Sequence, residues 1–132
     1  MSEEFTVLVI EDDASTRNVI AEVLRDDGIA TDVADGYYSG LQAFVPGKYQ
    51  VAIIDNQLGD GIGTELCREL KILDPSVKLF LFAGASENVR LEALSAGVVE
   101  VLQKPYDLSK LAYLAKREAW RNDTETDNSS VV

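Results

Sequence analysis

Five apolar segments of strand length recur along the chain, and each is followed by a segment whose apolar residues have helical spacing. Two of them, Gln50–Asp55 (QVAIID) and Val77–Ala83 (VKLFLFA), are apolar at consecutive rather than alternate positions. Strands of this kind are buried on both faces, which is typical of a parallel sheet covered by helices. We therefore predict an α/β fold in which five strands and five helices alternate.

The predicted elements follow each other without a long gap. The strands are expected at Phe5–Ile10, Ile29–Ala34, Gln50–Asp55, Val77–Ala83 and Val99–Gln103. The helices are expected within Ser15–Gly28, Tyr37–Val45, Ile62–Asp74, Glu87–Gly97 and Leu108–Trp120. Asp13 or Ser15 can cap the first helix, and Gly28 can end it.

The length of 132 residues suits one domain, which we assign to residues 1–120. Residues 121–132 are almost entirely polar, and we expect a disordered tail or linker there. The N-terminal residues lack the basic and apolar regions of a signal peptide. No apolar run reaches the roughly 18 residues that a membrane span needs. We therefore expect a cytoplasmic protein with no membrane contact.

The composition excludes several classes of site. The net charge is −11, which argues against direct contact with nucleic acid or an anionic membrane and favours cations and basic partners. The chain has no histidine, so it has neither a histidine-based triad nor a histidine-ligated zinc site. Its single cysteine, Cys67, cannot form an internal disulfide, and its place in a predicted helix favours a core position.

Charged residues gather where the predicted strands end. Glu11, Asp12 and Asp13 follow the first strand, Asp55 ends the third, and Lys104 follows the fifth. In parallel α/β sheets the ligand site lies beyond the carboxyl ends of the strands, so these side chains are expected to converge. Like charges about 4 Å apart repel by roughly 4 kcal/mol at an effective dielectric of about 20, so the acids need a cation or a proton.

Oxygen ligands without histidine or cysteine favour a hard cation, Mg²⁺ or Mn²⁺. A carboxylate held between such a cation and a lysine is suited to attack a phosphoryl group. Asp55, on the central strand, is our candidate acceptor. Taken singly, the acids after the first strand could be a helix N-terminal acidic run, Asp55 a capping residue and Lys104 a surface lysine. Their joint placement at one sheet edge favours the functional interpretation.

Four segments together resemble the receiver domain of bacterial two-component response regulators, a CheY-like family: VLVIEDD, VAIIDNQLGDGIGTEL, ALSAG and LQKPY. The resemblance covers about residues 5–120 and implies a flavodoxin-like, doubly wound (βα)5 sheet in the order 2-1-3-4-5. It implies that Glu11 and Asp12 are the acidic pair and that Asp13 is a further acid. It also implies that Asp55 is the phosphoacceptor, that the backbone carbonyl of Gln57 binds the metal, and that Lys104 contacts the phosphoryl group.

The resemblance further implies transfer from a sensor histidine kinase or a histidine phosphotransfer protein, with docking on the first helix. Self-association is expected through the fourth helix, fifth strand and fifth helix. The domain would not be an enzyme, beyond its own phosphorylation and dephosphorylation.

The sequence departs from the family at its switch residues. The family has Thr or Ser at the end of the fourth strand, where this chain has Ala83, or Phe82 if the alignment shifts by one residue. Ser86 could substitute only if its loop folds back. The family often has an aromatic residue where this chain has Val101. We therefore expect intact phosphorylation chemistry with altered signal propagation.

The loop after Asp55 is also unusual. Gly59 stands where the family often has proline, and with Gly61 and Gly63 it predicts a loop of greater flexibility. Two other functions remain open. A pseudo-receiver would use the fold as a protein-interaction module without phosphoryl transfer, which the altered switch residues favour. A haloacid-dehalogenase-like phosphatase would need an Asp-x-Asp motif after the first strand, which is absent.

Overall fold

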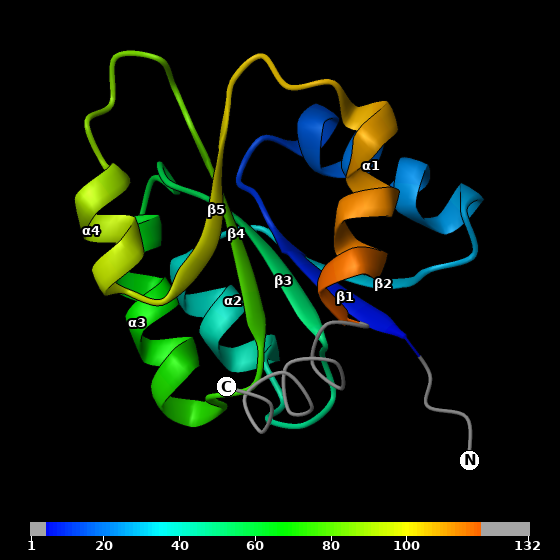
Figure 1. Cartoon of the computed structure of the whole chain (residues 1–132), viewed down its shortest axis with the longest axis horizontal. Helices are drawn as coiled ribbons and strands as arrows, with labels where there is room; N and C mark the ends of the chain where they lie inside the picture. The colour runs from blue at the N-terminus through cyan, green and yellow to red at the C-terminus, as the bar shows by residue number, and fades with distance from the viewer. Residues whose placement is uncertain (1–4, 120–132) are drawn as a thin grey trace, which may run out of the picture.

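A five-stranded parallel sheet lies between helices on both of its faces in the computed structural model, which describes residues 5–119 (Figure 1). The strand order is β2-β1-β3-β4-β5, which confirms the predicted topology. The strands are β1 (Thr6–Ile10), β2 (Ala30–Ala34), β3 (Val51–Asp55), β4 (Lys78–Ala83) and β5 (Val98–Gln103). The predicted tail at 121–132 lies outside the described residues.

The helices are α1 (Ala14–Asp26), α2 (Tyr37–Ala43), α3 (Gly63–Leu73), α4 (Arg90–Ser95), a 3-10 turn η1 (Leu108–Lys110) and a C-terminal helix over 111–119. Helix α4 begins at Arg90, three residues later than the sequence predicts. Residues 84–89 form a loop there, because the side chain of Glu87 bonds back to the end of β4. None of the helices within residues 5–119 is long and apolar enough to cross a membrane.

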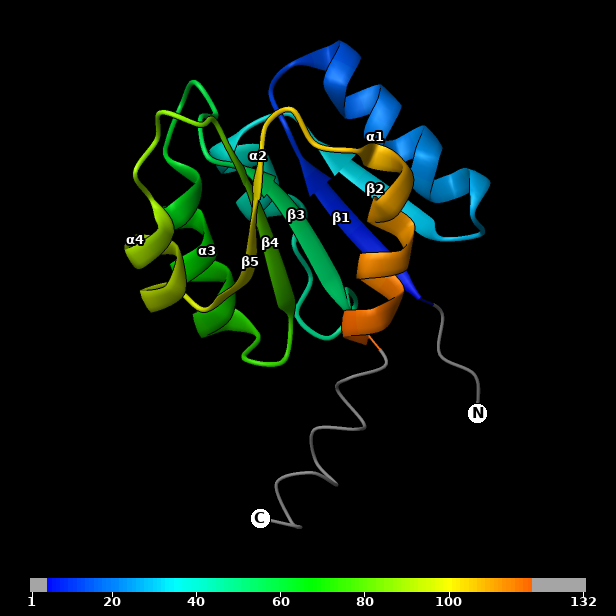
Figure 2. The same cartoon turned by 45° about the horizontal axis from the view of Figure 1, so that its top comes forward.

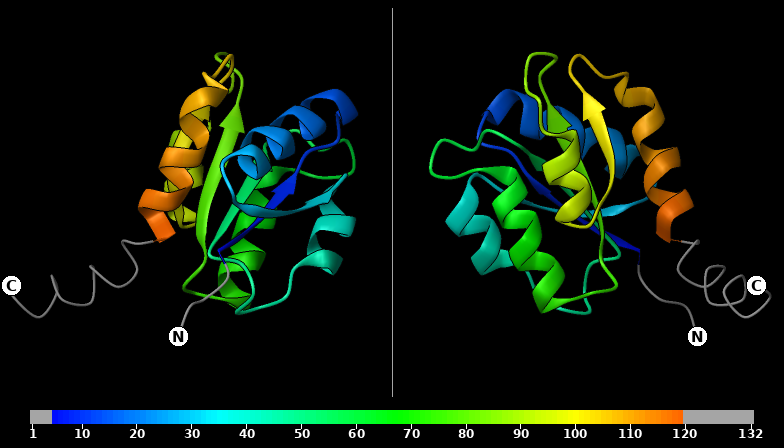
Figure 3. Two further views of the ribbon diagram at one scale, coloured as in Figure 1. Left: turned by 90° about the vertical axis from the view of Figure 1, so that its right-hand side faces the viewer. Right: turned by 60° about the vertical axis from the view of Figure 1, so that its left-hand side comes forward.

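Two separate cores explain why β1 and β3 are apolar at consecutive positions. Leu8, Ile10 and Ile54 pack on one face, with residues of α2, α3 and α4. Val9 and Ile53 pack on the other face, with residues of α1 and the C-terminal helix. Figure 3 shows the two helical layers from the side. Every residue of β1 and β3 is therefore buried.

Parallel pairing brings the carboxyl ends of all five strands to one edge (Figure 2). Ile10 pairs with Ile54, and Asp55 pairs with Phe82, so the segments after β1, β3 and β4 begin at nearly the same depth. The first and last described residues lie at the opposite, amino-terminal edge (Figure 2). The carboxyl edge of the sheet is thus free of both ends of the described chain.

Candidate functional site

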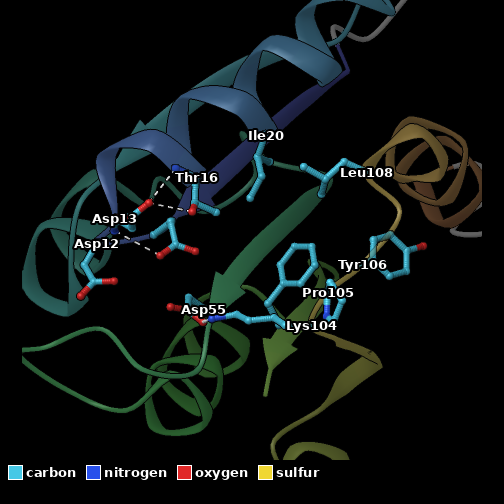
Figure 4. A pocket seen from close by; sticks show the side chains of 11 residues that line it. Asp12, Asp13, Thr16, Ile20, Asp55, Lys104, Pro105, Tyr106 and Leu108 are labelled. Carbon is cyan, nitrogen blue, oxygen red and sulfur yellow. Dashed lines mark hydrogen bonds and ion pairs between the residues drawn. The ribbon is translucent and has the colours of Figure 1, made fainter. Parts of the chain in front are cut away.

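Asp55 ends β3 with its side chain only 4% exposed, and its Oδ1 lies 2.7 Å from Nζ of Lys104 (Figure 4). The contact has the distance of an ion pair. No residue in the described part of the chain donates a hydrogen bond to Oδ1 in favourable geometry. A buried carboxylate oxygen without a donor is costly unless a cation faces it. The Lys104 ammonium is the cation that faces Oδ1, and no hydrogen bond from the described residues occupies this oxygen.

Three carboxylates converge at this point. Ligand oxygens of Glu11, Asp12 and Asp55 lie within 4.8 Å of one another. Glu11 and Asp55 are buried, whereas Asp12 is exposed at the mouth. An all-oxygen set with one open side fits Mg²⁺, which retains several waters and prefers few protein ligands. Oδ1 of Asp55, which accepts no hydrogen bond from the described residues, supports the same fit.

The surroundings of Glu11 favour its protonated form when no cation is bound. Burial, together with the charge and hydrogen bonding of Asp55, raises the pKa of Glu11 to about 7, although a hydrogen bond from the Asp13 amide opposes this. The Asp13 amide donates to Glu11 Oε2 at 3.1 Å. Near neutral pH, a proton on Glu11 therefore removes the negative charge that a bound cation would otherwise offset.

Asp13 has a different role from its two neighbours. Its carboxylate accepts hydrogen bonds from the Thr16 amide at 2.8 Å and the Thr16 hydroxyl at 2.7 Å, as an N-cap of α1. These bonds lower the pKa of Asp13. It does not belong to the carboxylate cluster in residues 5–119. Of the acids after β1, Glu11 and Asp12 therefore belong to the carboxylate cluster, and Asp13 caps the helix.

Lys104 is fixed at the end of β5 by its backbone. Its amide donates to the carbonyl of Ala83 at 2.9 Å, which continues the pairing of β4 with β5. Burial alone would lower the pKa of Lys104, but contact with Asp55 and the charges of Glu11 and Glu87 outweigh it and raise the pKa. Lys104 therefore remains a fixed ammonium beside Asp55.

The glycine-rich loop after Asp55 is held by specific contacts. Gln57 pairs with Ile62 in an antiparallel bridge, and the Gly63 amide donates to the Asn56 carbonyl at 2.7 Å. A Cβ at Gly61 would lie 2.4 Å from the Tyr37 ring. Close packing, and not the predicted flexibility, therefore accounts for Gly61 and Gly63. The two bonds at this bridge use the carbonyls of Asn56 and Gly61, so the Gln57 carbonyl takes no part in them.

Gly63→Ala should destabilise the protein, because its Cβ would lie 2.5 Å from the backbone oxygen of Asp55. Backbone atoms cannot shift as easily as a flexible side chain to relieve this clash, so we expect a loss of about 2 kcal/mol in the free energy of unfolding. Urea denaturation measures it. In Gly47→Ala nothing lies within 4 Å of the added Cβ, so only the positive φ of 86° is strained. Equal losses in the two variants would contradict the packing argument.

The end of β4 confirms that Ala83, and not Phe82, is its last residue, and Val101 lies on the adjacent strand β5. A hollow of about 150 Å³ lies there, lined by Ala83, Val101 and the loop before α4. Ser86 is exposed in that loop. The residue that folds back is Glu87, which the sequence did not single out.

A second hollow, of about 440 Å³, joins the charged cluster to an apolar surface (Figure 4). Its apolar side is lined by Ile20 of α1 and by Phe82, Tyr106 and Leu108. The rings of Phe82 and Tyr106 meet edge to face, with centroids 5.7 Å apart. The carboxylates are therefore reached through a mouth that also offers apolar contact.

A sequence model of the response regulator receiver domain matches residues 7–116. The chain belongs to this family. Receiver domains bind Mg²⁺ at an acidic pocket, and they interact with histidine kinases or phosphotransfer proteins. Glu11, Asp12 and Asp55 form such an acidic cluster in this receiver domain.

Curated relatives include both sensors and regulators. The chain is 34% identical over 129 residues to the aerobic respiration control sensor protein ArcB of Escherichia coli (strain K12), covering 96% of this chain and 16% of ArcB. It is 30% identical over 105 residues to the KDP operon transcriptional regulatory protein KdpE of the same organism, covering 80% of this chain and 47% of KdpE. The chain thus spans less than half the length of these relatives.

Solved receiver domains share the fold. A CheY-like receiver domain protein from Methanospirillum hungatei JF-1 superposes with a TM-score of 0.86 at 23% identity, covering 94% of this chain and 99% of that one. A receiver domain protein from Clostridium thermocellum gives 0.85 at 24% identity, covering 91% and 98%. Both likenesses support the flavodoxin-like topology of this receiver domain.

The pKa of Glu11 makes the stability of the metal-free receiver domain fall as pH rises. Between its usual value of 4.5 and about 7, Glu11 is protonated in the folded state and ionised in the unfolded state. The free energy of unfolding therefore decreases through this window, by on the order of 2 kcal/mol. Mg²⁺ held by this cluster would need the ionised carboxylate, so the rise in Tm that it causes should be larger above about pH 7 than below it.

Thermal unfolding across this pH range, with and without Mg²⁺, measures both effects. Glu11→Gln cannot titrate, so the metal-free variant should lose the slope. The same slope in wild type and Glu11→Gln would show that another group is responsible.

Proposed function

We propose that this receiver domain accepts a phosphoryl group on Asp55 from a histidine kinase or a histidine phosphotransfer protein, in a reaction that needs Mg²⁺ or Mn²⁺. One observation carries the proposal: the Asp55 oxygen that lacks a hydrogen-bond donor is buried beside Lys104 and within an acidic cluster. Glu11, Asp12 and Asp55 would hold the metal ion through carboxylate oxygens, with the Gln57 backbone carbonyl as a further ligand.

The residues have distinct tasks in this reaction. A carboxylate oxygen of Asp55 attacks the phosphorus, a new P–O bond forms, and the P–N bond to the donor histidine breaks. Lys104 neutralises a phosphoryl oxygen as charge spreads over the group. Its raised pKa keeps the ammonium charged. The metal ion, when bound, supplies further neutralisation of the phosphoryl oxygens. The departing imidazole takes a proton from the solvent.

The donor is proposed to dock beside α1. The hollow of about 440 Å³ opens between Thr16 and Ile20 of α1 and Tyr106 after β5, so an imidazole on a partner helix would meet apolar surface next to the acids.

Self-association is proposed through α4, β5 and the C-terminal helix, where Leu91, Leu94 and Tyr113 are exposed. A cytoplasmic location belongs to the same proposal, because phosphoryl donors derived from ATP are made there.

A pseudo-receiver is the second candidate, because Ala83 and Val101 supply neither a hydroxyl nor an aromatic ring. Incubation with acetyl phosphate separates the two functions. We expect the intact mass to increase by one phosphoryl group when Mg²⁺ is present, and to stay unchanged when the metal is chelated. A pseudo-receiver would show no increase in either condition. Such a result at millimolar Mg²⁺ would overturn the proposed function.

A further inference from the structure

The loop between β4 and α4 is pinned by one carboxylate. Oε2 of Glu87 accepts a hydrogen bond from the Gly84 amide at 2.8 Å, and Oε1 accepts one from Nδ2 of Asn56 at 2.6 Å. Asn56 directly follows Asp55, and Gly84 directly follows β4. Glu87 therefore joins the loop to the residue next to the proposed acceptor.

One of the two donors held by Glu87, the Gly84 amide, lies just beyond the end of β4, beside the strand that ends at Asp55. The Asn56 side chain lines another hollow than the Asp55 side chain does. Asp55 pairs with Phe82, so Gly84 lies two residues, or roughly 7 Å, further along the adjacent strand. A phosphoryl group on the Asp55 side chain extends beyond the strand end in the same direction. Phosphoryl oxygens need several donors, and charge-assisted bonds to backbone amides are among the strong ones.

The charge of Glu87 also acts on the same lysine. Burial would raise the pKa of Glu87, but hydrogen bonds from Asn56, Gly84 and Gln57 and the charge of Lys104 outweigh it and lower the pKa. Glu87 is thus held as an anion within the field of Lys104. The Glu87 carboxylate thus occupies hydrogen-bond donors as a bound anion would, although it belongs to the same chain.

We propose that the Glu87 carboxylate occupies the Gly84 and Asn56 donors in the resting domain, and that phosphorylation of Asp55 displaces it and releases the loop before α4. This inference rests on the proposed function of Asp55. The phosphoryl group brings negative charge to Lys104, on which the charge of Glu87 also acts, and it competes with Glu87 for the Gly84 amide. Loop release would then replace the hydroxyl-based switch that Ala83 cannot provide.

The displaced carboxylate has space and a positive charge nearby. Glu87 and Arg68 both line a hollow of about 310 Å³ between α3 and the loop before α4. Arg68 donates to the exposed Ser95 hydroxyl at 3.1 Å, so its guanidinium is held at the surface of α4. A shift of Glu87 toward Arg68 would move the first residues of α4, because α4 begins at Arg90, three residues after Glu87.

Beryllofluoride with Mg²⁺, a phosphoryl mimic, tests the proposal by NMR titration of the ¹⁵N-labelled protein. In wild type, the Gly84 amide and the Asn56 side-chain amide should shift on binding. In Glu87→Ala both donors are already released, so beryllofluoride should bind roughly three- to tenfold more tightly. Glu87→Gln loses the charge but keeps one acceptor oxygen, so the gain in affinity should be smaller. Glu92→Gln removes the same charge from α4 without touching either donor, and it should bind like wild type.

The outcomes separate this inference from the function on which it rests. No binding to wild type would overturn the proposed function and this inference together. Binding of equal strength to wild type, Glu87→Gln and Glu87→Ala would overturn the inference alone. Tighter binding to Glu92→Gln as well would point to general charge repulsion and would also overturn it.

Discussion

Asp55→Asn should abolish phosphorylation by acetyl phosphate and leave the protein folded. The amide has nearly the shape of the carboxylate, but it offers no oxygen nucleophile at neutral pH and removes one charge from the metal cluster. The same change should stabilise the metal-free protein, because the charge of Asp55 is one reason why the pKa of Glu11 is raised. We expect a complete loss of the phosphorylated species together with a higher Tm in the absence of Mg²⁺.

Intact mass and thermal unfolding measure the two effects on the same sample. Asp13→Asn is the matched control, since it removes one charge two residues from Glu11 and asparagine caps a helix as well as aspartate does. It should be phosphorylated like wild type. Phosphorylation of Asp55→Asn at the wild-type level would show that the acceptor is another residue.

Lys104→Ala should slow phosphorylation about 100-fold, which is typical of removing one preorganised group that stabilises transition-state charge. Nζ of Lys104 lies 2.7 Å from Oδ1 of Asp55. It would therefore contact the negatively charged oxygens of a phosphoryl group on Asp55 from the side of β5. Without it, Glu11 and Asp55 lose a shared cation, so the metal-free protein should be less stable than wild type. The variant thus has the opposite effect on Tm from Asp55→Asn.

The rate of acetyl phosphate modification at saturating Mg²⁺ measures the loss. Lys110→Ala serves as the control, because Lys110 is exposed on η1 and lines none of the three described hollows that contain Asp55 or Glu87. It should react at the wild-type rate. If Lys104→Ala reacted as fast as Lys110→Ala, the lysine would have a structural role only.

The sequence predicts the site because parallel topology converts the order of strand ends into a spatial arrangement. Glu11, Asp12, Asp55 and Lys104 each lie next to a strand end, so their convergence follows from strand order alone. Glu87 lies four residues beyond β4, and its position depends on how the loop turns back. No periodic pattern encodes that turn, so the sequence instead predicted a helix starting at Glu87.

The glycines after Asp55 show the same limit. Their contacts with Tyr37 and with the backbone of Asp55 join segments that are distant in sequence or fixed by one particular turn. A glycine in a sequence is equally consistent with flexibility and with close approach, and only the three-dimensional neighbour decides between them. Asp13 was ambiguous for a similar reason, because an acid at a helix start can cap the helix or bind a cation.

Both ends of the described chain lie at the edge of the sheet opposite to Asp55 (Figure 2). A tether, fluorescent protein or surface anchor attached there would leave the acceptor mouth accessible to a partner of protein size. The same arrangement sets a design rule for chimaeras built on this domain. A module joined rigidly at residue 5 or residue 119 would lie away from the phosphorylated edge, so it would sense phosphorylation through the packed helices along the sides.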